Sequence, residues 1–192
     1  MRHAQILIAA VLVAFFVNPV SANEYADAIK KHAETVKSWL SDDAIQTTLQ
    51  TSNDKYSGEH KRSLMVLDRK WKKEQDKDSQ PIISAVMGNV LSAYLKKKKE
   101  ESQGLYAEII VLNERGLSAG QSNVTEDYWY GQKDIWKETF RKGTKSILIG
   151  EVEKDESSQK PQSRLSLPVP HPGGKYNVGS ISIRLNVEML PK

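Results

Sequence analysis

The stretch VGSISIRLNV, residues 178–187, alternates apolar and polar side chains along its length. Successive side chains of an extended strand point to opposite faces of the sheet. The alternation therefore gives one apolar face and one polar face: Ile181, Ile183, Leu185 and Val187 on the first, Ser182, Arg184 and Asn186 on the second. Such a pattern is typical of an antiparallel sheet whose apolar face is covered by other elements.

Three stretches upstream also have strand character. GLYAEIIVLNERG (104–116) is rich in β-branched residues and ends in a predicted turn at Asn113–Gly116, while KSILIGEVE (145–153) and SRLSLPVP (163–170) alternate or run apolar. Proline and glycine clusters such as HPGG (171–174) supply turns between them. Together the stretches predict a meander of about five strands.

The first half of the chain has helical periodicity instead. Apolar residues recur at helical spacing from Glu24 to about Gln50, with a second helix capped by the oxygens of residues 41–43. A third helix follows the Ser57-Gly58 break, and a fourth begins at Pro81 and keeps helical spacing over four turns to Leu95. We therefore predict an α+β domain, with N-terminal helices packed on one face of an antiparallel β-sheet.

The chain begins like a secreted protein. A basic start, an apolar run from Ile6 to Val17 and small residues leading to Ala22 are the pattern of a secretory signal peptide. The run has about 12 residues, fewer than the roughly 20 that span a bilayer. We expect residues 1–22 to be a signal peptide cleaved near Ala22, and residues 23–192 to form one periplasmic domain. An uncleaved membrane anchor is the alternative.

Composition excludes several classes of function. The chain has no cysteine, so it has no disulfide and no thiolate ligand or nucleophile. Its net charge of +4 is modest, and lysines interleave with acids, so we expect no nucleic-acid partner. Beyond the signal peptide, His32, His60 and His171 lack metal-ligand spacing, so we expect neither a metal nor another cofactor.

GLSAG, residues 116–120, matches the G-x-S-x-G nucleophile elbow of α/β-hydrolases. Asp155 and His171 even follow Ser118 in the chain order of that catalytic triad. The elbow, however, requires a helix immediately behind the serine, and residues 121–125 are poor helix starters. A turn that leads into a short second strand is the better interpretation, and we expect no catalytic residue and no enzyme activity.

The aromatic stretch VTEDYWYGQKDIW, residues 124–136, falls between predicted strands. It is predicted to be an insertion across one face of the sheet, with a short helix in QKDIWKETF (132–140) that places Ile135, Trp136 and Phe140 on one side. An aromatic-rich insertion over a sheet is typical of the wall or lid of a ligand pocket.

Five segments follow one another in the order of a known family: LDRKW (67–71), NVLSAYL (89–95), GLYAEIIVLNERG (104–116), DYWYGQKDIW (127–136) and the stretch from SRLSLPVP to VGSISIRLNV. In this order they resemble the single Cache, or PDC-sensor, domains, which are PAS-like extracytoplasmic ligand-binding modules. The resemblance covers roughly residues 34–190. One departure is Asn113-Glu114, where the family more often has an aspartate.

The resemblance implies a pocket between the sheet and the aromatic insertion, on the face opposite the long helices. The predicted ligand-binding residues are Tyr128, Trp129, Trp136, Arg164, Ser166 and Ser182. Aromatic rings supply walls and directional N–H or O–H groups. Arg164 is suited to hold a carboxylate, so we expect the ligand to be a small molecule that carries one.

The resemblance also implies a sensory function. We expect a stand-alone, secreted form that binds a small molecule, has no signalling domain of its own and acts with a membrane receptor or transporter. The alternative is a structural or interaction module whose pocket is collapsed. A ligand that stabilises the folded protein would distinguish the two hypotheses.

Overall fold

The computed structural model describes residues 23–191, so the predicted signal peptide lies outside the described residues. The helices in this range are α1 (Ala26–Lys37), α2 (Asp43–Tyr56), α3 (Lys61–Glu74), α4 (Pro81–Met87), α5 (Val90–Glu101), α6 (Asp134–Lys137) and the 3-10 helix η1 (Val187–Met189). The strands are β1 (Tyr106–Asn113), β2 (Ser118–Gln121), β3 (Leu148–Ile149), β4 (Glu153–Lys154), β5 (Pro161–Pro170) and β6 (Asn177–Asn186).

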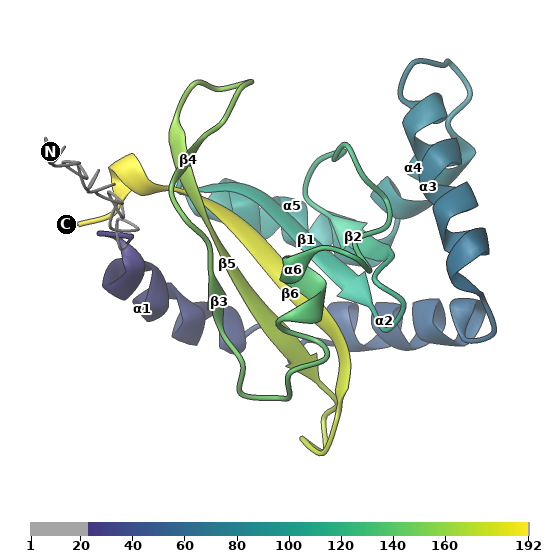
Figure 1. Ribbon diagram of the computed structural model, residues 1–192, viewed down its shortest axis with the longest axis horizontal. Helices are drawn as coiled ribbons and strands as arrows, with labels where there is room; N and C mark the ends of the chain where they lie inside the picture. Colours follow the sequence, from purple (N-terminus) through teal and green to yellow (C-terminus); the bar gives the residue numbers. More distant parts are fainter. Residues whose placement is uncertain (1–22, 192) are drawn as a thin grey trace, which may run out of the picture.

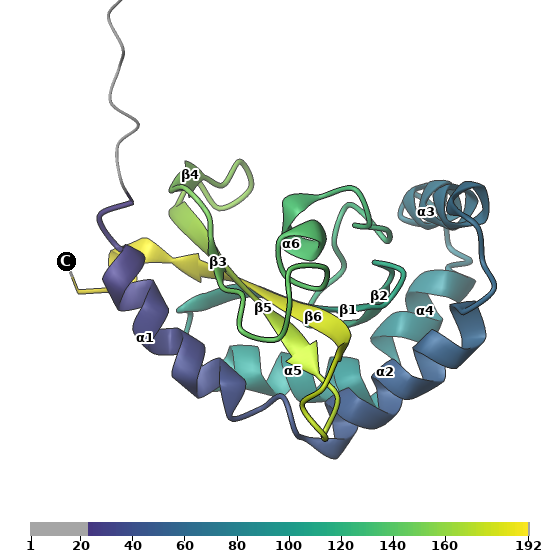
Figure 2. The same cartoon turned by 60° about the horizontal axis from the view of Figure 1, so that its bottom comes forward.

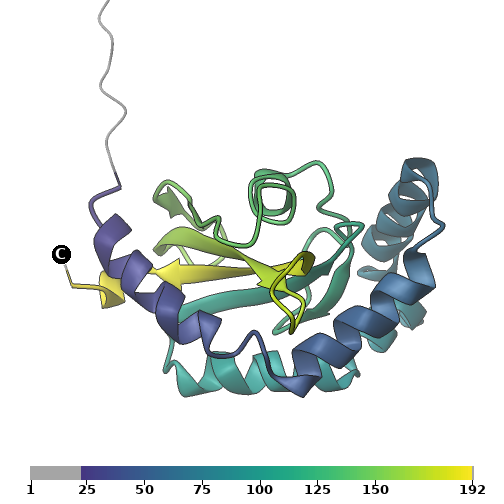
Figure 3. The same cartoon turned by 90° about the horizontal axis from the view of Figure 1, so that it is seen from below.

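The strands form one antiparallel sheet in the order β2-β1-β6-β5-β3, and β4 pairs with the start of β5 (Figure 1). Helices α1, α2 and α5 cover one face, while α6 and its flanking loops lie over the other (Figures 2 and 3). The predicted α+β class, with N-terminal helices on one face of a PAS-like antiparallel sheet, is confirmed. The sheet has six strands in this range instead of the predicted five or so.

The single helix predicted from Pro81 to Leu95 is wrong, because the chain turns between α4 and α5. Asn89 is the N-cap of α5, and its Oδ1 accepts a hydrogen bond from Ser92 N at 2.8 Å. Its Nδ2 donates to Ala119 O of β2, also at 2.8 Å. Asparagine is favoured at caps, where its side chain replaces the missing backbone partner. The apolar spacing continues through the turn, which is why it predicted one helix.

The strand predicted in KSILIGEVE is also shorter than expected. Only Leu148–Ile149 and Glu153–Lys154 pair with β5. Between them Gly150 N still donates to Arg164 O at 2.8 Å, while the side chains of Glu151 and Val152 are exposed. The edge of the sheet is therefore interrupted at this place.

The main core lies between the sheet and the three long helices. It is built from alternate residues of the strands and the inner stripes of the helices, among them Ile109, Val111, Leu165, Leu167, Ile181, Ile183 and Leu185 with Ile29, Val36, Ile45, Leu49, Leu91 and Leu95. The face predicted for Ile181, Ile183, Leu185 and Val187 is therefore the helix-covered one. Among residues 23–191, no helix is both long and apolar enough to cross a membrane.

Helix α5 approaches β2 so closely that only glycine fits at residue 120. A Cβ added to Gly120 would lie 2.5 Å from Leu91 Cγ, and Leu91 is fully buried. Gly120→Ala is therefore expected to lower the free energy of unfolding by about 1–3 kcal/mol, the usual cost of overpacking. Urea unfolding measures it. Gly58→Ala is the control, because nothing lies within 4 Å of its added Cβ. Equal, small effects at both positions would contradict the close packing.

Candidate functional site

Residues 122–147, between β2 and β3, form a cover over the sheet face that is turned away from α1, α2 and α5 (Figure 2). We call this the outer face. Trp136 Nε1 donates to Asn113 O at 3.1 Å, and Asn177 Nδ2 donates to Phe140 O at 2.8 Å. The cover is thus fastened to the ends of β1 and β6, as expected for an insertion across one face.

Helix α3 holds the other side of the cover. Asp68 Oδ1 accepts hydrogen bonds from the backbone N–H groups of Tyr128 and Trp129 at 2.8 and 3.0 Å. Trp71 Nε1 donates to Thr125 O at 2.8 Å, and Lys72 Nζ lies 2.6 Å from Asp127 Oδ1. The aromatic stretch is consequently fixed between the sheet and α3.

Tyr128 faces α3 rather than the sheet. Its side chain is buried, its ring stacks on Trp71 with centroids 5.1 Å apart, and its hydroxyl lies 3.3 Å from that of Tyr56. Burial, followed by the contact with Tyr56, raises the pKa of Tyr128 well above its usual range. The ring belongs to a second core cluster, with Leu64 and Leu117.

Trp129 and Trp136 lie together near the end of β1, and Trp136 also packs against Ile110 and Leu112 on the outer face. Trp129 Nε1 donates to Arg115 O at 2.8 Å, and the Trp136 ring stacks on Phe140 at 5.2 Å. Both indoles line a hollow of about 420 Å³ that also includes Arg115. Trp129 also packs against the cluster that contains Tyr128, so the three predicted aromatic residues are connected but border two different hollows instead of one pocket.

Tyr130 also packs on the outer face, and it was not among the predicted ligand-binding residues. It contacts Ile110 and Leu112, and its hydroxyl lies 3.0 Å from Thr125 Oγ1. Burial raises its pKa above the usual range. Only Ile110 and Leu112 could have signalled this role, because two apolar residues on the non-core side of β1 require an apolar cover.

The structure does bring Arg164, Ser166 and Ser182 together, side by side on β5 and β6. Arg164 Nη1 lies 3.2 Å from Ser182 Oγ, and the hydroxyls of Ser166 and Ser182 are 2.8 Å apart. Arg164 also pairs with Glu108 of β1, Nη1 to Oε1 3.1 Å, with both side chains mostly buried. Glu108 was missed, although a lone acid within the apolar strand YAEIIVLN is itself a signal.

A second arginine stands directly opposite the first. Arg164 and Arg184 are register partners on β5 and β6. Like charges in that position repel, and here each guanidinium has its own acid. Arg184 Nη1 lies 3.1 Å from Asp155 Oδ1. Hydrogen bonds from Ser158 and Ser157, and the charge of Arg184, lower the pKa of Asp155 to about 2, so it is ionised at neutral pH.

Arg164, Arg184 and Asp155 line a pocket of about 240 Å³ between α6 and the β3–β5 edge, which we call the arginine pocket. Its walls are Asp134, Ile135, Leu148, Gly150, Glu151, Glu153, Lys154, Asp155, Gln162, Ser163, Arg164 and Arg184. Charges of both signs therefore face one small space. Gln162 is buried, and its Oε1 has no hydrogen-bond partner within residues 23–191. Such an atom could accept a bond from a ligand N–H group.

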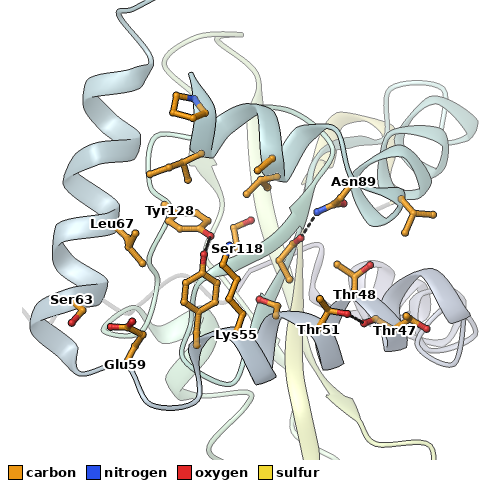
Figure 4. Close-up of a pocket in the computed structure, with 18 of the residues that line it drawn as sticks. Thr47, Thr48, Thr51, Lys55, Glu59, Ser63, Leu67, Asn89, Ser118 and Tyr128 are labelled. Carbon is orange, nitrogen blue, oxygen red and sulfur yellow. Dashed lines mark hydrogen bonds between the residues drawn. The ribbon is translucent and has the colours of Figure 1, made fainter. Parts of the chain in front are cut away.

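A larger groove of about 940 Å³ lies elsewhere, between α2, α3, α4 and β2 (Figure 4). Threonines 47, 48 and 51 face the apolar side chains of α3 and α4 across it, and Tyr128 and Ser118 form part of its floor. Ser118 lies in a strand that continues to Gln121, and its Oγ lies 3.4 Å from Gly120 O. Ser118 is therefore not at the turn between a strand and a helix, where a nucleophile elbow places its serine.

The described residues contain no group of three or more His, Asp or Glu side chains placed to hold a metal ion. The arrangement that remains on the outer face is one of paired charges, hydroxyls and a free amide oxygen. Such groups recognise a polar molecule by hydrogen bonds and charge.

No protein-family model matches the sequence, and no curated protein matches it. Solved structures with a similar fold include the ligand-binding domain of the Campylobacter jejuni chemoreceptor Tlp3 with 4-methylisoleucine (15% identity, TM-score 0.40, 90% of this chain and 64% of that chain). They also include the sensor domain of the V. cholerae histidine kinase DctB (14% identity, TM-score 0.38, 85% of this chain and 57% of that chain). A third is the ligand-binding domain of the Pseudomonas aeruginosa chemoreceptor PctC with GABA (14% identity, TM-score 0.38, 66% of this chain and 57% of that chain).

Two of these are ligand-binding domains of chemoreceptors, and the other is the sensor domain of a histidine kinase. This chain is similar to them in fold. The chain spans about three fifths of the length of these domains.

The ion pair on the outer face gives a stability prediction. Glu108→Ala is expected to lower the free energy of unfolding by about 3 kcal/mol, because Arg164 would be left as a mostly buried cation without its acid. Chemical denaturation measures the loss. Glu34→Ala is the matched control, because the ion pair of Glu34 with Lys37 is exposed. This substitution should lower the free energy of unfolding by less than about 0.5 kcal/mol. A loss at Glu108 as small as that at Glu34 would show that the pair has no structural role.

Proposed function

We propose that this protein is a periplasmic, sensor-type protein that binds a small polar molecule in the arginine pocket. The observation that carries the proposal is the pair of arginines on β5 and β6 beside the unpaired Gln162 oxygen. The pocket is smaller than the roughly 300–1,000 Å³ of sites for drug-sized ligands, so it suits a compact molecule.

The charges of the pocket favour a ligand with both a carboxylate and an amine. A guanidinium can hold a carboxylate through two parallel hydrogen bonds. Glu108 and Asp155 already pair with the two arginines, and Asp134 lies 3.0 Å from Lys137 Nζ. Glu151 and Glu153 also line the pocket, and neither has an ion-pair partner within residues 23–191. Their carboxylates would attract an ammonium group, and Gln162 Oε1 would accept one of its hydrogens. Ser166 and Ser182 would keep Arg164 in position from behind.

A ligand panel tests this function. Thermal unfolding is measured in the presence of carboxylates, amines and amino acids. A compound at one hundred times its Kd adds about 2.7 kcal/mol to the free energy of unfolding and raises Tm by several degrees. We expect compounds with both charges to give the largest shift. Arg184→Gln should remove it, whereas Lys175→Gln, an exposed position outside the pocket, should keep it. Without any shift, the alternative of an interaction module with a collapsed pocket would be favoured.

The proposal includes secretion and a membrane partner that responds to the bound state, as the resemblance to Cache sensor domains implies. We expect the protein from the periplasmic fraction to begin at or near Asn23, because small residues precede that position. Mass spectrometry of the intact protein measures its first residue. Recovery of the protein in the membrane fraction with residues 1–22 attached would instead support the anchor.

A further inference from the structure

Helix α3 stands at one end of the molecule and is attached along one side only (Figures 2 and 3). Its attached side contains Leu64 and Trp71, which are buried, and its two acids. Asp68 accepts from the backbone of the cover, and Glu74 Oε2 accepts from Ile82 N and Ile83 N at 2.8 and 3.0 Å. Both negative charges of α3 are therefore turned toward the protein.

The helix carries the excess charge of the whole chain. Its 14 residues contain six cations (Lys61, Arg62, Arg69, Lys70, Lys72 and Lys73) and two acids (Asp68 and Glu74), a net charge of 6 − 2 = +4. The complete sequence has 28 cations and 24 acids, which is also +4. The other residues of the sequence are consequently balanced, 22 cations against 22 acids, so α3 has the same net charge as the whole chain.

Most of these cations point away from the protein. Lys61, Arg62, Arg69 and Lys73 are exposed and surround Met65, an exposed apolar side chain; we call these five residues the basic face of α3. Positions 62, 65, 69 and 73 share one side of a helix by their spacing. None of the four cations has an ion-pair partner within residues 23–191, whereas Lys72 pairs with Asp127.

We propose that the basic face of α3 docks on an anionic lipid surface. A helix of 14 residues is about 21 Å long, so its cations can meet several headgroups at once. A basic helix surface with an apolar residue at its centre is suited to a membrane surface, where charge attracts it and Met65 can enter the headgroup layer.

A lipid surface fits better than a protein because the basic face is the outer side of a single helix. The large groove borders the basic face along Val66, and Ser63 and Leu67 line it farther round the helix. A flat layer of headgroups requires only charge and exposure, and the basic face offers both. This inference does not depend on a ligand in the arginine pocket.

Vesicle flotation tests the proposal on the secreted protein, with phosphatidylcholine vesicles that contain or lack about 30% phosphatidylglycerol. We expect binding to the anionic vesicles alone, and its loss in about 1 M NaCl, where the Debye length is about 3 Å. Substitution of Lys61, Arg62, Arg69 and Lys73 by Gln should weaken binding at least about ten-fold. These side chains are exposed and unpaired, so the variant should keep its Tm.

The matched control replaces Lys30, Lys31, Lys96 and Lys97 by Gln, an equal charge change at exposed positions of α1 and α5. It should keep its affinity within about two-fold. All variants carry the same N-terminus, so any contribution of residues 1–22 cancels. An equal loss in the control, equal binding to neutral vesicles, or binding to polyglutamate but not to vesicles would each overturn the proposal. The last result would assign the face to an acidic protein.

Discussion

A sheet that is buried on both faces, and polar on one of them, is the constraint to which the rest of this structure conforms. Strand β6 lies in the middle of the sheet, with its apolar side chains against the long helices and its polar ones beneath the cover. Burial of a polar group costs free energy unless it forms hydrogen bonds. On the outer face Arg164 pairs with Glu108 and Ser166 with Ser182. Gln162 Oε1 and Ser180 Oγ, by contrast, have no hydrogen-bond partner among the residues that the structure describes.

The fold could be predicted from the sequence in regular strands and helices, where the two-residue or 3.6-residue repeat determines the direction of each side chain. The alternation in β6 correctly assigns its core face, and the same logic correctly places Arg164 beside Ser166. The turn at Asn89 escaped prediction because the apolar spacing continues through it, although the local cap that Asn89 provides for Ser92 was a signal. Its second bond, to the distant Ala119, could not be read from the sequence.

The candidate site was less predictable, for two physical reasons. Tyr128, Trp129 and Tyr130 lie in an irregular segment, where no period relates neighbouring side chains. Tyr128 and Trp129 pack with the cluster beside α3, whereas Tyr130 packs on the outer face. The partners of the arginines depend on strand register, which composition does not determine. Asp155 becomes recognisable only when the loop before β5 has been placed, whereas Glu108 could have been selected as a lone acid in an apolar strand.

The contact of Asn89 with β2 has a consequence for how the protein behaves in a crowded solution. An edge strand presents unpaired N–H and C=O groups that another chain can adopt as a template. Here Ala119 O accepts from Asn89, and Gln121 N donates to Ser92 Oγ at 3.0 Å. The first turn of α5 thus occupies hydrogen-bonding groups that a strand from a second molecule would need. Growth of the sheet from molecule to molecule, the first step of β-aggregation, is opposed at this edge by two side chains.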